Sequence, residues 1–78
     1  MTMAASHEKA KELVIAYFQT LELNGYRYEH VSTRINAILR NEWNVVFDVY
    51  SPNGCLIDGP AVFVVEKGTG LVRSIMAL

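Results

Sequence analysis

Few side chains in this sequence could carry covalent or acid-base chemistry, and they are scattered along the chain. The single cysteine, Cys55, would need a base and an orienting group beside it to act as a nucleophile, and its neighbours supply neither. We interpret it as an incidental loop thiol. His7 and His30 are the only histidines, and no second ligand stands at metal-binding spacing from either. The sequence therefore predicts neither a metal site nor a bound cofactor.

The carboxylates and glycines lead to the same expectation. General acid-base catalysis needs paired carboxylates, or a carboxylate beside a histidine, in one pocket. Asp48 stands at an outward position of a strand-like stretch, and Asp58 precedes Gly59-Pro60, which is typical of a turn. No glycine follows the order of strand, Gly-rich loop and helix that binds phosphate. We therefore expect no catalytic residues and no enzymatic activity.

Aromatic and charged side chains suggest a different activity, the binding of another protein. Tyr26, Tyr28 and His30 share one parity of a strand-like stretch, and aromatic residues concentrate at interaction hot spots. A solvent-facing stripe without a partner is the simpler interpretation of these three rings. The predicted partner-binding surface is the outward face of a sheet and its loops, formed by Tyr26, Tyr28, His30, Arg34, Asp48 and Tyr50.

The first element that must position these side chains is a helix. Apolar residues recur from Ala10 to Leu21 at helical spacing, and charged residues occupy the opposite side. Ser6 stands before this pattern as an N-cap. Asn24-Gly25 provides a stop, because glycine takes the left-handed conformation without a steric penalty. The pattern predicts a helix over about residues 7–24.

After Gly25 the hydrophobic period changes from about 3.6 residues to about 2. Odd-numbered residues from Val31 to Ala37 alternate with polar ones, which predicts a strand over about residues 26–39 with Val31 on its buried side. Part of this stretch also fits a helix, but its tyrosines and β-branched residues favour the strand. Arg40-Asn41 then predicts the tip of a hairpin.

The second half of the chain predicts three more strands. The odd-numbered residues from Trp43 to Val49 are apolar and predict a strand over residues 42–50 with these residues in the core, so Trp43 is first a packing residue. Ser51-Pro52-Asn53-Gly54 is a strong turn signal. Gly68-Thr69-Gly70 joins two further apolar stretches in a β-hairpin. These stretches predict strands over residues 60–67 and 70–77.

The predicted fold class is therefore α+β, with one N-terminal helix packed on a four-stranded curved antiparallel sheet. A chain of 78 residues forms at most one domain, here residues 1–78, and hydrophobic residues make up 51%, enough for one small core. A helix on one side of the sheet leaves the other side, and at least one edge strand, to solvent or to a partner.

Charge and apolar runs narrow the class of partner. Seven Lys and Arg nearly balance eight Asp and Glu, and the one aromatic-basic cluster, Tyr26-Arg27-Tyr28, is followed by Glu29, so we expect no nucleic-acid binding. The longest apolar run, Ala61 to Val65, is far shorter than the roughly 18 residues of a membrane helix. The first residues do not resemble a secretory signal, and a lone cysteine suits a reducing compartment. We expect a cytoplasmic protein without membrane contact.

A longer pattern adds a resemblance. Trp43-x-Val45-x-Phe47 leads one strand, and after a glycine-rich connection the stretch from Gly59 to Ile75 ends in an apolar hairpin that contains Lys67-Gly68-Thr69-Gly70. Over about residues 42–76 this resembles the small bacterial immunity proteins of the immunity protein 35 family and their relatives of cystatin-like or NTF2-like shape. The resemblance implies a protein that binds and neutralises a cognate toxin, and it marks no catalytic residues.

One property departs from part of that expectation, and two alternatives stay open. Inhibitors of basic nucleases are often strongly acidic, whereas the net charge here is −1, so the toxin need not be a nuclease. The apolar run from Ala61 to Val65 suggests a second possibility, a structural or regulatory module that forms a homodimer through an exposed edge strand. The third, a small NTF2-like enzyme, would need a longer chain and a carboxylate in a pocket.

Overall fold

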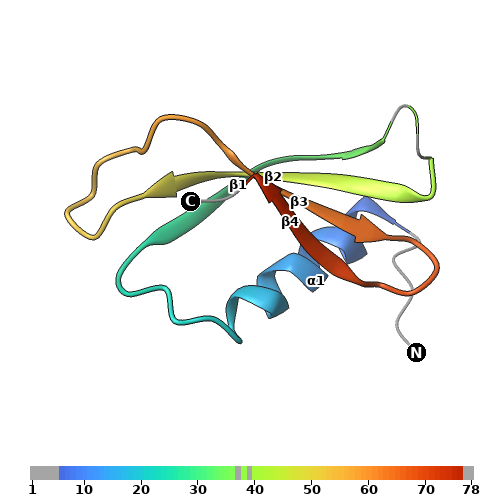
Figure 1. Cartoon of the computed structure of the whole chain (residues 1–78), viewed down its shortest axis with the longest axis horizontal. Helices are drawn as coiled ribbons and strands as arrows, with labels where there is room; N and C mark the ends of the chain where they lie inside the picture. The colour runs from blue at the N-terminus through green and yellow to red at the C-terminus, as the bar shows by residue number, and fades with distance from the viewer. Residues whose placement is uncertain (1–5, 37, 39, 77–78) are drawn as a thin grey trace.

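The described residues form one helix and four strands. The strands make a single antiparallel sheet in the order β1-β2-β3-β4, and α1 lies across one side of it (Figure 1). The predicted α+β fold is confirmed. No helix among the described residues is long and apolar enough to cross a membrane. The computed structural model describes residues 6–36, 38 and 40–76, with α1 (His7–Phe18), β1 (Arg27–Ile35), β2 (Glu42–Tyr50), β3 (Ala61–Glu66) and β4 (Val72–Met76).

The start of α1 follows the sequence pattern, but its end does not. Ser6 is the N-cap, and its side chain accepts a hydrogen bond of 3.2 Å from the amide of Lys9. The helix ends at Phe18 and not near residue 24, because the chain tightens there into bonds between residues three apart, such as Leu21 N–H to the Phe18 carbonyl. Asn24 and Gly25, both with positive φ, form a separate turn before β1.

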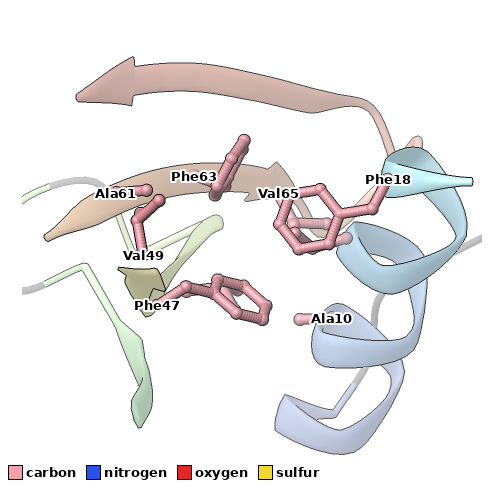
Figure 2. Packing of buried hydrophobic residues seen from close by; sticks show 9 residues of the cluster. Ala10, Phe18, Phe47, Val49, Ala61, Phe63 and Val65 are labelled. Atoms are coloured by element: carbon pink, nitrogen blue, oxygen red, sulfur yellow. The ribbon is translucent and has the colours of Figure 1, made fainter. Parts of the chain in front are cut away.

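The core lies between α1 and the sheet. Phe18 of α1 meets Phe47 and Phe63 of the strands edge-to-face, with ring centroids 4.9 Å and 5.1 Å away (Figure 2). The odd-numbered residues of β2 turn toward the helix as predicted, and Trp43 packs half-buried against the same cluster. The buried apolar cluster consists of Ala10, Val14, Phe18, Val45, Phe47, Val49, Ala61, Phe63 and Val65.

The strand β1 contains an irregularity that the sequence pattern did not predict. His30 pairs with Phe47 and Ser32 pairs with Val46, so Val31 is an extra residue, a β-bulge, and its side chain is 54% exposed. The prediction of a buried Val31 was wrong, because the bulge inverts the alternation of the strand. Before the bulge the even-numbered residues face α1, and after it the odd-numbered residues do.

The strand boundaries follow the predictions with small differences. β2 has the predicted bounds, and Arg40-Asn41 lies in the connection from β1 to β2, as expected. β1 ends at Ile35, short of the predicted residue 39, and residues 37 and 39 lie outside the described residues. β3 is one residue shorter at each end than predicted, and β4 begins two residues later than predicted. The predicted end of that strand, residue 77, lies outside the described residues.

The edges of the sheet are β1 and β4, not β3. The apolar run from Ala61 to Val65 lies in β3, which pairs with β2 on one side and β4 on the other, so its backbone is not an exposed edge. Both edge strands carry a bulge, since Ile75 of β4 is also an extra residue and is 53% exposed. Bulges at edges disrupt the ladder of hydrogen-bonding groups that a second strand would use.

Candidate partner-binding surfaces

Three of the six predicted site residues lie together on the side of the sheet that faces away from α1. We call this side the outer face. Arg34 is opposite Asn44, Asp48 is opposite Glu29, and Tyr50 is opposite Arg27. The outer face includes Arg27, Glu29, Ser32 and Arg34 of β1, Glu42, Asn44, Val46, Asp48 and Tyr50 of β2, Val62, Val64 and Glu66 of β3, and Arg73 of β4.

The centre of the outer face is apolar and its margins are charged. Val64 is 3% exposed although α1, the helix of the described residues, lies on the other side of the sheet. At one margin Arg73 donates a hydrogen bond of 2.6 Å to the carboxylate of Glu42, which is 8% exposed. The Oδ1 atom of Asn44 is buried and has no hydrogen-bond partner. Such mixed surfaces suit protein contacts.

Tyr28 and His30 lie on the opposite side of the sheet, which corrects the predicted outward stripe of three rings. The ring of Tyr28 stacks on Phe18 at 4.5 Å, and that of His30 meets Phe47 at 5.6 Å. The reason is the bulge at Val31, which turns the even-numbered residues before it toward α1. Tyr28 is therefore partly a core residue, and the six predicted residues form two separate groups.

His30 is exposed, and its ring interacts with neighbouring polar and charged groups. Its Nε2 atom lies 2.7 Å from the hydroxyl oxygen of Thr33. Desolvation and the positive charge of Lys11, with a smaller effect of His7, lower the pKa of His30 below its usual 6.5. A hydrogen bond that the ring donates to the backbone of Ser32 acts in the opposite direction. The imidazole is thus neutral in the folded protein at physiological pH.

Tyr26 and Tyr28 meet in a hollow at the end of the molecule where α1 stops. We call this hollow the loop-end groove. It has a volume of about 570 Å³ and is predominantly apolar. Tyr26 is 41% exposed and Leu21 is 42% exposed, so large apolar side chains border open space here. The lining residues are Leu21, Glu22, Leu23, Asn24, Tyr26, Tyr28 and Ile57.

Two loops that are distant in sequence build the loop-end groove. The segment 19–26 follows α1, and the segment 51–60 connects β2 with β3, at the same end of the molecule (Figure 1). They touch where Gly25 meets Pro52, since a Cβ atom at Gly25 would lie 3.2 Å from that ring. The second loop folds back on β2, with Ile57 N–H donating to the Val49 carbonyl at 2.8 Å. This fold-back brings Ile57 to the groove.

The residues that could do covalent chemistry do not come together. Cys55 is a free, exposed thiol in the 51–60 loop, as predicted. Asp58 is exposed in the same loop, and His7 sits in the first turn of α1 with its ring 6.5 Å from that of Trp43. Within residues 6–36, 38 and 40–76, no group of three or more His, Cys, Asp or Glu side chains could hold a metal ion.

Sequence reasoning missed the aliphatic half of the loop-end groove. Leu21 fitted the apolar stripe of the helix, and Leu23 and Ile57 showed no periodicity of their own. The only signal was the combination of Asn24-Gly25 with Ser51-Pro52, two turn motifs whose contact depends on the register of the sheet.

Comparison with known proteins gives no further identification. No protein-family model, no curated protein and no solved structure matches the chain.

Proposed function

We propose that the protein is a non-enzymatic immunity protein, which neutralises a cognate bacterial toxin in the cytoplasm by docking on it directly. The observation that carries this proposal is the loop-end groove, where Tyr26 and Tyr28 border a hollow of about 570 Å³. Its size is typical of a hollow that receives a few side chains or a small ligand, about 300–1,000 Å³.

The groove has the composition of an interaction hot spot. Tyrosines are enriched at hot spots because the ring contributes contact area and the hydroxyl a directed hydrogen bond, at little cost in side-chain entropy. Tyr28 is held in place before binding, since its ring stacks on Phe18 at 4.5 Å. A preorganised ring loses less entropy on association, so its contacts contribute more to affinity.

The lining residues also define the kind of group that would bind. Leu21, Leu23 and Ile57 provide aliphatic contacts, and Glu22 is the charged residue among the described lining residues. An aromatic or aliphatic side chain of the toxin, with a basic group next to it, matches this arrangement. The net charge of −1 does not oppose such a contact, because the complementary charge is local.

The motif behind the family resemblance explains the hairpin rather than a site. The hydroxyl of Thr69 donates to Glu66 Oε1 at 3.1 Å and accepts from the amide of Leu71 at 3.2 Å, while Gly70 takes a φ of 73°. Thr-Gly at this place closes the turn between β3 and β4. The resemblance therefore supports a shared fold, and the groove at the other end of the sheet supports the binding role.

A titration tests the proposal. The natural probe is the product of a toxin gene adjacent to the gene of this protein, purified in an inactive form. Tyr26→Ala should weaken its binding by about 10- to 100-fold, as expected for a hot-spot tyrosine, with unchanged unfolding behaviour. Tyr50→Ala, on the outer face, is the matched control and should bind like the wild type. Equal affinity of wild type and Tyr26→Ala would exclude the groove as the docking site.

A further inference from the structure

The outer face carries an unfavourable pair of like charges. Glu29 and Asp48 are directly opposite each other on β1 and β2, and like charges in such positions repel. The Nη1 atom of Arg27 lies 3.4 Å from the Oε2 atom of Glu29 in an exposed ion pair. This pair offsets the charge of one of the two carboxylates. Within the described part of the chain, Asp48 takes part in no ion pair.

A positive charge without a partner lies on the same face, some distance along the strands. Arg34 is exposed, opposite Asn44, and forms no ion pair with any described residue. Asn44 and Asp48 are four residues apart on β2, which corresponds to about 13 Å at about 3.3 Å per residue. Arg34 therefore cannot reach Asp48 within one chain.

The uncharged positions lie midway between these two groups. We call a row of residues that lie opposite one another across the strands a level. Ser32, Val46 and Val62 form one level, and along β2 it lies two residues from the level of Arg34 and two from the level of Asp48. Val46 and Val62 are half-buried, so they remain accessible to a partner. Along the strands the outer face thus carries Arg34 and Arg73 on one side of this level and Glu29 and Asp48 on the other. Glu42 and Glu66 lie beyond the first pair, and Arg27 lies beyond the second.

We propose that a second copy of this chain packs on the outer face, with a two-fold axis that crosses the strands at the level of Ser32, Val46 and Val62. Such an axis reverses the strand direction, so the level of Arg34 in one copy meets the level of Asp48 and Glu29 in the other. The valine level meets itself. The contact of Arg34 with Asp48 and Glu29 therefore forms twice, as in any isologous dimer.

Face-to-face packing fits the sheet better than pairing of edge strands. Both edges are interrupted by bulges at Val31 and Ile75, whereas none of the helices and strands of the described residues covers the outer face. Sheets pack in this way at about 10 Å, with their strands within about 30° of each other. The outer face has an area of roughly 500 Å² per copy, estimated from the strand lengths and a strand spacing of about 4.8 Å. An interface of this size is among the smallest that bind specifically, so we expect a weak dimer.

Two charge reversals test the dimer without any toxin. The measurement is sedimentation equilibrium or light scattering of the whole chain, over a range around the micromolar dissociation constant expected for a small interface. Arg34→Glu alone and Asp48→Arg alone each place like charges in both contacts, and each should weaken the dimer by about 10-fold or more. Glu12→Arg, on the exposed side of α1, is the control and should dimerise like the wild type.

Mixing the two variants distinguishes this dimer from other arrangements. An equimolar mixture of Arg34→Glu and Asp48→Arg contains heterodimers in which both contacts again join opposite charges, so the dimer should return. If Asp48→Arg does not fold, Glu29→Arg, at the same level and exposed, replaces it. A wild type that stays monomeric overturns the proposal, as do single variants that dimerise normally or a mixture that stays monomeric. If the dimer is disproved, the proposal for the loop-end groove is unaffected, because Tyr26→Ala tests that surface separately.

Discussion

Phe18 is the residue that joins α1 to the sheet and to the loop-end groove, so its removal is the most informative test of the packing. The side chain is 9% exposed and contacts Tyr28, Phe47 and Phe63 at ring distances of 4.5, 4.9 and 5.1 Å. Phe18→Ala should lower the free energy of unfolding by about 3–5 kcal/mol, from lost burial and the cavity left behind. A chain of 78 residues has a total of about 4–12 kcal/mol at the usual stability per residue, so the variant should be barely stable.

The assay is urea unfolding followed by circular dichroism, with a paired control from the same helix. With a slope of about 1–1.5 kcal/mol per molar urea, the midpoint of Phe18→Ala should fall by about 2–5 M. Ile15→Ala removes an aliphatic side chain that is 40% exposed, and its free energy of unfolding should stay within about 1 kcal/mol of the wild type. Phe18→Leu should fall between the two, because it keeps most of the volume and loses the aromatic contacts. Equal losses for Phe18→Ala and Ile15→Ala would refute this packing.

Three further predictions concern single side chains. Arg73→Ala leaves the buried carboxylate of Glu42 unpaired and should lower the free energy of unfolding in urea by about 1–3 kcal/mol. Adding Glu42→Gln should recover part of this loss, because it removes the unpaired charge. An absence of recovery would contradict a buried charge at Glu42. Val31→Asp should cost less than about 1 kcal/mol because the bulge exposes that side chain, whereas Val45→Asp should abolish folding by circular dichroism. The fold lowers the pKa of His30, so the unfolded chain binds a proton at this side chain before the folded chain does as the pH falls through 6.5. The free energy of unfolding should therefore decline below that pH, and it should decline less in His30→Gln. A decline as steep in His30→Gln as in the wild type would assign the effect to other groups.

The bulge at Val31 shows what periodicity can and cannot predict. The alternation after Val31 is real, and Thr33 and Ile35 are opposite Val45 and Trp43 on the side of α1. The inserted residue carries no distinctive side chain, because an exposed valine in an edge strand looks in sequence like a buried one. One undetected extra residue exchanged the sides of Tyr28 and His30 and so divided the predicted binding surface in two.

The loop-end groove shows a different limit. Each local feature was predictable, including the turn at Asn24-Gly25, the turn at Ser51-Pro52 and the strand β2 that carries the second loop. Their contact is not a local property, since it depends on how far α1 extends and on the pairing of β1 with β2. The helix ended six residues earlier than the pattern suggested, and that difference left Leu21 and Leu23 to line the groove.

The most direct test of the proposed function is a methyl NMR titration of the protein with the inactive toxin, at one fixed concentration of this chain. If the toxin docks in the loop-end groove, the methyl signals of Leu21, Leu23 and Ile57 should shift or broaden as the complex forms, while those of Val46 and Val62 on the outer face stay unchanged. Shifts of the two valines without any change at the three groove residues would contradict the account.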